Sequence, residues 1–340
     1  MIVSFRLGGV DGVSIEAAKW RAAMESLGHE VTTVAGAGRA EVLLPGLAID
    51  AKAPPSVHGL NDAFGDADLV LVENLASLPL NPPAREVLYD VLSGRPALFR
   101  HHDLPWQRPH LAHLEGPRDA PTWRHVTINE LSRLELLGRA IVATTIRNSF
   151  DCDPPRGHRE RTRRALDVGS QLLALAPTRA IPRKNLEGAL ALCASLGADL
   201  WLLGPSEDGY ETALRELIEA SPVTVRRGAP SGVSIHDAYA ACDLVVMASS
   251  CEGFGNPVLE SVTHQRPLAL NPYPVAREIT AHGFDFFDLE DVAGLASFLA
   301  RPDEALFEHN LDVARAHFNL NALPERLAGL LSQSGIEPPQ

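Results

Sequence analysis

The residues best suited to chemistry lie in one short stretch that combines two glycines, a proline and two carboxylates. It reads Cys-Glu-Gly-Phe-Gly-Asn-Pro-Val-Leu-Glu over residues 251–260. The apolar run at 243–249 predicts a strand, so the stretch should lie at a strand's carboxyl end, where open α/β sheets bind ligands. We expect Glu252 and Glu260 to border a ligand there and to accept hydrogen bonds from its hydroxyl groups.

The backbone of the same stretch predicts an anion site. Gly253 and Gly255 permit a sharp turn, and Asn256 as N-cap with Pro257 at the first helical position predicts the start of a helix. The unpaired N–H groups of a helix N-terminus, together with its dipole, favour a phosphate.

A second charged cluster, Arg-Ala-Ile-Pro-Arg-Lys-Asn at 179–185, follows another strand-like run and precedes a helix. Lys184 is the only lysine after Lys52 in a chain whose other cations there are arginines. Because a helix start disfavours cations, phosphate binding by Arg179 and Lys184 is favoured over a solvated surface charge.

Composition excludes several classes of protein. A chain of 340 residues predicts roughly two domains, and a net charge of −13 should repel nucleic acid and anionic membrane surfaces. The sequence shows neither an apolar stretch of spanning length nor a leader-like start, so a cytoplasmic location is expected. The four cysteines lack C-x-x-C spacing, which favours reduced thiols over zinc or disulfides.

Strand-like and helix-like segments alternate along the chain, which predicts an α/β fold with two parallel sheets. The expected strands are 2–7, 29–36, 68–74, 95–101, 125–129, 139–146, 171–177, 199–205, 223–228, 243–249 and 266–271. The expected helices are 13–27, with Ser14 as N-cap, 84–92, 186–196, 210–220 and 235–241. We expect domains at 1–155 and 171–315, an Arg-rich linker at 156–170 that follows two prolines, and a C-terminal helix at 316–340 whose packing against the N-terminal domain is left open.

Together these motifs resemble family 4 of the retaining glycosyltransferases, which have the GT-B fold. The resemblance is carried by Arg179 with Lys184, the paired glutamates, Gly8-Gly9, Gly-His-Glu-Val at 28–31, and Asn-Ser-Phe-Asp at 148–151, where serine replaces the family's glycine. It implies two Rossmann-like parallel-sheet domains facing each other across a cleft. The C-terminal domain would hold a nucleotide-sugar and the N-terminal domain most of the acceptor.

The resemblance also implies residue roles. Arg179 and Lys184 would bind the diphosphate, Glu260 the ribose, and Glu252 the donor sugar. The remaining expected donor-binding residues are Gly9, Gly204, Phe254, Gly255, Asn256 and Pro257.

A catalytic histidine that faces the sugar is implied at the end of an N-domain strand, and Phe-Arg-His-His-Asp at 99–103 offers two. Successive strand residues point to opposite faces, and the family's histidine precedes an aspartate, so we prefer His102 to His101. A structural histidine stays an alternative. A metal cluster of His101, His102, His110 and His113 is a weaker one, because the spacing matches no metal motif.

The acceptor is expected to be a small soluble polyol or anion, since the helix at 84–92 is charge-balanced and strong membrane binding is not expected. For the segment that follows the two histidines, an exposed loop without a ligand is an equally good interpretation. The expected acceptor-binding residues are Gly8, Asp11, Arg100, His101, Asp103, Trp106 and Arg108.

These features predict a retaining glycosyltransferase that moves a hexose from a nucleotide-diphosphate sugar, of the GDP-mannose or UDP-glucose type, to an acceptor hydroxyl. Fixed cations would stabilise the leaving diphosphate, so no cofactor is expected and Mg²⁺ should not be essential. A nucleotide-sugar epimerase of the same fold and a non-catalytic nucleotide-sugar binder are the alternatives. A homodimer is compatible with the sequence.

Overall fold

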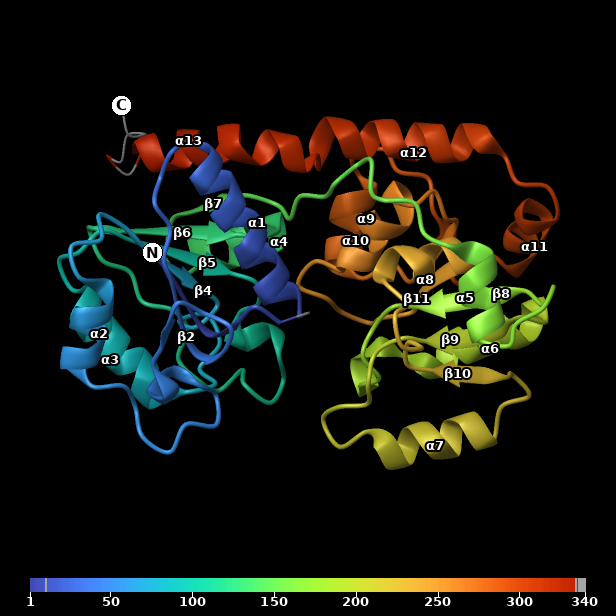
Figure 1. Ribbon diagram of the computed structural model, residues 1–340, viewed down its shortest axis with the longest axis horizontal. Coiled ribbons are helices and arrows are strands. Elements are labelled where there is room, and N and C mark those ends of the chain that lie inside the picture. The colour runs from blue at the N-terminus through green and yellow to red at the C-terminus, as the bar shows by residue number, and fades with distance from the viewer. Residues whose placement is uncertain (10, 334, 336–340) are drawn as a thin grey trace. The chain divides into compact units, whose positions relative to one another are not determined.

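The computed structural model describes residues 1–9, 11–333 and 335, and the chain divides into two compact units (Figure 1). The first unit contains residues 1–149 together with the C-terminal segment from Leu320, and the second spans Phe150–Asn319. Each unit is built on one parallel sheet. No helix among the described residues combines the length and apolar character needed to cross a membrane.

The sheet of the first unit has the strand order β3-β2-β1-β4-β5-β6-β7. Its strands are β1 (Ile2–Leu7), β2 (Thr33–Gly38), β3 (Val42–Leu43), β4 (Val70–Glu73), β5 (Ala97–His101), β6 (Trp123–Thr127) and β7 (Ala143–Thr145). Its helices are α1 (Gly12–Ser26), α2 (Val57–Phe64), α3 (Pro82–Leu92), α4 (Glu130–Leu137) and α13 (Leu323–Gln333). The order reverses between β1 and β4, so the loops after these two strands border the expected ligand site of such a sheet.

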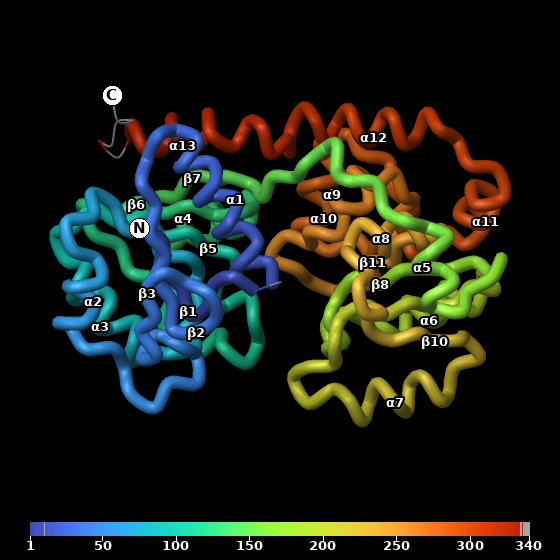
Figure 2. The backbone as a smooth tube through the Cα atoms, viewed as in Figure 1, coloured from blue at the N-terminus to red at the C-terminus, as the bar shows by residue number. Residues whose placement is uncertain are grey.

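Apolar residues on alternating positions of β5 supply cores on both faces of this sheet. Phe99 packs in the core that α2 and α3 cover, whereas Leu98 packs in the core that includes Trp20 of α1 and Leu327 of α13. Figure 2 traces α13 back to α1, with which it is in contact. The helix α13 is therefore part of the first unit.

A buried cluster of charged side chains lies on the α1 side of the sheet. Arg100 of β5 is fully buried, and its guanidinium donates to Glu16, Glu73 and Asn148, each at 3.1 Å. It also lies over the Trp20 ring at 4.3 Å. The expectation that Arg100 contacts an acceptor is therefore wrong, because strand alternation turns it into the core.

Replacing Arg100 with Met should leave Glu16 and Glu73 as buried carboxylates without this cation. We expect the Arg100→Met variant to lose about 3–5 kcal/mol of unfolding free energy, measured by urea denaturation. Arg21→Met, which breaks partly exposed pairs with Glu25 and Glu41, should lose only about 0–1 kcal/mol. Equal losses in the two variants would contradict this interpretation.

The sheet of the second unit has the order β10-β9-β8-β11-β12-β13. Its strands are β8 (Leu173–Ala176), β9 (Asp199–Leu202), β10 (Val225–Arg227), β11 (Leu244–Met247), β12 (Leu268–Leu270) and β13 (Phe287–Asp288). Its helices are α5 (Arg159–Ala165), α6 (Leu186–Leu196), α7 (Glu211–Glu219), α8 (Ile235–Ala241), α9 (Asn256–Thr263), α10 (Pro274–Thr280), α11 (Val292–Ala300) and α12 (Glu304–His317). This is the Rossmann order, with its switch point between β8 and β11.

Three local expectations differ from the structure. The N-cap of α1 is Asp11 rather than Ser14, because the Asp11 carboxylate accepts from the Ser14 N–H at 3.2 Å. The strand expected at 29–36 begins only at Thr33. The segment 156–170, expected to be a linker, contains α5, which packs against α8 within the second unit.

Candidate active site

The switch point of the second unit brings both charged motifs together. Arg179 and the 3₁₀ turn η3 (Pro182–Lys184) follow β8, and the glutamate-containing stretch follows the neighbouring β11. The two loops are joined by a backbone hydrogen bond of 2.9 Å from the Ser250 N–H to the Arg183 carbonyl.

Glu252 lies between two cations. One carboxylate oxygen pairs with Lys184 Nζ and the other with the Arg183 guanidinium, which also donates to the Cys251 carbonyl at 2.8 Å. The Glu252 side chain is only 7% exposed. Burial lowers the pKa of Lys184 and opposes ionisation of Glu252, yet the two cations hold the Glu252 pKa below its ordinary value. Sequence reasoning missed Arg183, and its position beside Lys184 was the only available signal.

Arg179 occupies a more open position in the same loop. Its side chain is 43% exposed and pairs with Glu207 at 2.5 Å, and its charge helps to lower the pKa of Lys184. Gly204 permits this arrangement, because a Cβ there would lie 2.5 Å from the Thr178 carbonyl oxygen and 2.7 Å from the Arg179 nitrogen. The glycine is needed for close approach of two loops.

The helix that follows β11, α9, starts one residue earlier than predicted, because Asn256 was expected to be its N-cap. Gly255 is the N-cap, with φ +92°, so Asn256 is the first helical residue and Pro257 the second. A Cβ on Gly255 would lie 2.1 Å from the Tyr273 hydroxyl, which donates to the Phe254 carbonyl at 3.0 Å. Phe254 is buried, so its backbone rather than its ring is offered to a ligand.

Glu260 lies on α9 and is partly exposed. Its Oε2 accepts a hydrogen bond of 2.7 Å from the hydroxyl of Tyr239, a fully buried residue of α8. Sequence reasoning missed Tyr239, because nothing in the local pattern connects positions 21 residues apart.

In the first unit, the expected residues Gly8, Gly9 and Asp11 form the turn after β1. Gly8 has φ +70°, and the Arg39 guanidinium donates to its carbonyl at 2.9 and 3.2 Å. Asp11 caps α1 and pairs with Arg6 at 3.2 Å. The contacts of Gly8 and Asp11 with an acceptor, and of Gly9 with the donor, stay predictions.

His102, the expected catalytic histidine, is held by Glu73, the last residue of β4, and by Asn74, which follows it. Its Nε2 lies 2.8 Å from Glu73 Oε2, and its backbone N–H donates to Asn74 Oδ1 at 3.1 Å. Burial opposes ionisation of Glu73, but Arg100 and His102 bring its pKa below the ordinary value. An ionised Glu73 therefore orients the His102 ring.

His101 is turned the other way, into a buried chain of hydrogen bonds. Asp119 contacts His125 Nε2 at 3.1 Å, His125 Nδ1 contacts His101 Nε2 at 2.9 Å, and His101 Nδ1 contacts Ser77 Oγ at 2.7 Å. Burial lowers the pKa of both histidines, so both rings are neutral. The Asp119 carboxylate then fixes the tautomers, and Ser77 is the donor to His101. The expected contact of His101 with an acceptor is wrong, because its ring is buried and both its nitrogens are engaged.

The other expected acceptor residues form a loop that packs against α4. Asp103 pairs with Arg108 at 2.7 Å, and the Trp106 indole donates to Glu135 at 2.8 Å. All three predicted residues are partly exposed, and their acceptor contacts stay predictions. Within the described part of the chain no group of three or more His, Cys, Asp or Glu side chains is placed to hold a metal.

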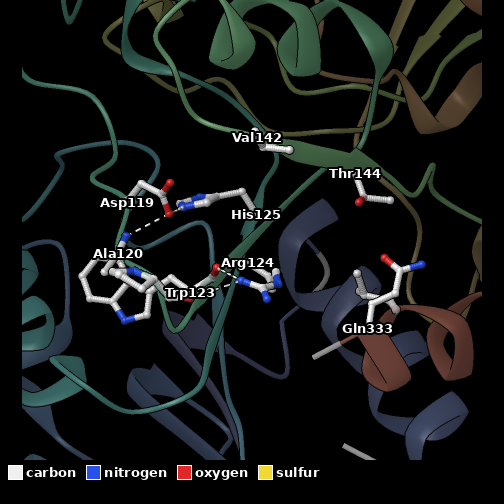
Figure 3. Close-up of a pocket in the computed structure, with 10 residues that line it drawn as sticks. Asp119, Ala120, Trp123, Arg124, His125, Val142, Thr144 and Gln333 are labelled. Atoms are coloured by element: carbon white, nitrogen blue, oxygen red, sulfur yellow. Dashed lines mark hydrogen bonds and ion pairs between the residues drawn. The ribbon is translucent and has the colours of Figure 1, made fainter. Parts of the chain in front are cut away.

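A cavity of about 580 Å³ lies elsewhere in the first unit (Figure 3). It is lined mainly by residues at the amino ends of β6 and β7 and by Leu330 and Gln333 of α13. Figure 3 shows Asp119 on its wall, joined to His125. None of the predicted site residues lines this cavity, and it lies at the wrong end of the strands for a substrate site.

The neutral histidines predict a stability that depends on pH. As the pH falls below about 6.5, the unfolded chain takes up protons at His101 and His125 while the folded chain resists them. The free energy of unfolding should therefore fall by up to about 1.4 kcal/mol per pH unit for each histidine. In urea titrations, His125→Gln should show a shallower fall than the parent protein, whereas His58→Gln, at an exposed site, should not. Identical slopes in all three proteins would contradict the assignment.

Comparison with known proteins bears on the fold and on the class of enzyme. No family model matches the chain. A curated relative, mannosylglucosylglycerate synthase of Thermotoga maritima, is 26% identical over 98% of both chains. The structure of Anabaena HepE in complex with UDP-glucose has a TM-score of 0.73 and 18% identity over 98% of this chain and 99% of its own. A glycosyltransferase from Rickettsia africae has a TM-score of 0.71 and 15% identity over 98% of both chains.

The structural similarity extends over nearly the whole chain and confirms the expected α/β fold with two Rossmann-like sheets. The curated relative likewise matches the chain from end to end. Retaining family 4, which the motifs resemble, is consistent with both findings. The chain is a glycosyltransferase of the GT-B fold.

Proposed function

We propose that the protein transfers a hexosyl group from a nucleoside-diphosphate sugar to a hydroxyl of a small acceptor that carries a carboxylate. The observation that carries the proposal is the set of cations beside the start of α9, Arg179, Arg183 and Lys184. The name of the Thermotoga maritima relative describes a product with two sugars and glycerate, which supports a hexose donor and an acidic acceptor.

The donor site is suited to stabilising a leaving diphosphate. Arg183 and Lys184 share the single carboxylate of Glu252, so one positive charge is left over for a ligand. The N–H groups at the start of α9 add a positive dipole end, beginning at the Gly255 turn. These groups are fixed before the ligand arrives, and fixed donors stabilise developing charge most effectively.

The reaction follows from this charge arrangement. The bond between the anomeric carbon and the diphosphate oxygen breaks with both electrons going to the diphosphate, while the acceptor oxygen forms the new bond to the anomeric carbon. The resemblance to retaining enzymes supports attack from the face that the diphosphate leaves, with the acceptor proton passing to a diphosphate oxygen. Glu252, already paired with two cations, borders the donor sugar and is not assigned as a nucleophile.

His102 is proposed to contact the donor sugar. Glu73 engages its Nε2 at 2.8 Å, so the Nδ1 edge is the part of the ring offered to a sugar hydroxyl. Arg100 holds Glu73 from its other oxygen at 3.1 Å, which keeps the imidazole in one orientation.

Lys184→Ala should lower the turnover number about 10²- to 10³-fold, because one fixed cation at the leaving group is lost. The measurement is release of nucleoside diphosphate coupled to product formation. The matched control is Lys52→Ala, at an exposed loop position, which should keep the parent rate. Near-parent turnover in Lys184→Ala, with the protein folded, would refute the donor site.

The donor can be identified by thermal shift with UDP, GDP and ADP. The matching nucleotide should raise the apparent free energy of unfolding by about 2.7 kcal/mol when its concentration is a hundred times its dissociation constant. That nucleotide's glucose and mannose conjugates are then incubated with glycerate or glucosylglycerate, and the products are identified by mass spectrometry. A glycosylated acid supports the proposal, whereas a new nucleotide-sugar formed from donor alone would indicate an epimerase. No shift with any of the three nucleotides would contradict the proposal.

A further inference from the structure

We infer that Tyr239 is a positioning residue for the donor, which fixes the Glu260 carboxylate so that it can accept hydrogen bonds from the ribose hydroxyls. The inference rests on the proposed function and on the expectation, implied by the resemblance to family 4, that Glu260 binds the ribose. Its observation is the 2.7 Å hydrogen bond from the Tyr239 hydroxyl to Glu260 Oε2, made by a side chain that is fully buried.

The Tyr239 ring is held in place by aromatic neighbours. His264, at the end of α9, stacks on it with 4.5 Å between ring centroids. The His264 Nδ1–H donates to the Glu260 carbonyl at 2.7 Å, which fixes the tautomer of the ring. Burial lowers the pKa of His264 to about 4, so its neutral Nε2 accepts from His236 Nδ1 at 3.0 Å. Glu260 is thus held at both its carbonyl and its carboxylate.

The helix that carries Tyr239 is anchored at its C-terminal end by arginines. Arg266 donates to the Tyr239 carbonyl at 2.7 Å, and Arg159 donates to the carbonyls of 240–242 at 3.0–3.1 Å. Arg163 adds a bond of 2.8 Å to one of these carbonyls. Cations at a helix C-terminus satisfy its unpaired carbonyls and complement its dipole. Rotation of α8 about its axis is thereby opposed, and the phenol keeps its direction.

The phenol is a permanent donor. Burial and the neighbouring Glu260 carboxylate raise the pKa of Tyr239 well above its usual range, so the hydroxyl keeps its proton at any working pH. A carboxylate that accepts this bond has its plane set before a ligand binds. Less rotational freedom is then lost when the ribose hydroxyls donate to it.

The test compares ribose recognition in Tyr239→Phe and in the parent protein. The nucleoside diphosphate that binds best among UDP, GDP and ADP is titrated calorimetrically beside its 2′-deoxy and 3′-deoxy forms. Loss of a hydroxyl that donates to a carboxylate should weaken parent binding about 10- to 100-fold. The ratio of the dissociation constant of a deoxy form to that of the complete nucleotide measures this effect. In Tyr239→Phe this ratio should shrink about 3- to 10-fold, because Glu260 is less well oriented. A general loss of stability would weaken the binding of the nucleotide and of both deoxy forms alike, and would leave the ratio unchanged.

Two further variants separate the outcomes. Tyr89→Phe removes another buried tyrosine hydroxyl, in the first unit, and should keep the parent ratio. Glu260→Gln should reduce the ratio at least as much as Tyr239→Phe. If the ratio falls in Glu260→Gln but equals that of the parent protein in Tyr239→Phe, the role of Tyr239 is overturned while the role of Glu260 stands. A parent ratio in both, or a parent protein that binds none of the nucleotides, would overturn the ribose assignment and this inference with it.

Discussion

The proposed donor site depends on one buried carboxylate, Glu252, which pairs with two cations from the neighbouring loop. Burying a charge costs several kcal/mol unless partners surround it, and removing one partner leaves that cost uncompensated. Arg183 and Lys184 are therefore held in place by Glu252, and Glu252 by them. In a chain with a net charge of −13, this mutual constraint keeps two cations together at the edge of the sheet where a diphosphate needs them.

The first unit has the opposite arrangement of charges, with one buried cation between two carboxylates. Arg100 is the buried cation, and it is shared between Glu16 and Glu73. Because Arg100 engages only one oxygen of Glu73, the other is left to hold His102. In the first unit the buried ion cluster orients His102, and in the second it holds Arg183 and Lys184 in place. The same ion pairs therefore stabilise the core and set the geometry of the candidate site.

Local patterns predicted the fold well, and long-range contacts account for what they missed. The helices at 186–196 and 235–241 were placed correctly because apolar spacing and turn residues determine them locally. Lys184 stood out because lysine is rare in this chain. Tyr239, by contrast, matters only through a residue on another helix. Strand alternation showed that His101 and His102 diverge, but it could not show which buried partner each one meets.

The segment at 156–170 shows why composition alone misled. Clustered arginines that follow two prolines are typical of an exposed linker, and the segment was predicted to be one. Its arginines instead donate to backbone carbonyls at the C-terminal end of α8. Arg159 and Arg163 also pair with Asp243, at the start of β11, so α5 stabilises the strand that leads into Glu252. A segment that resembles a linker thus supports both glutamates of the donor motif, Glu252 through β11 and Glu260 through Tyr239.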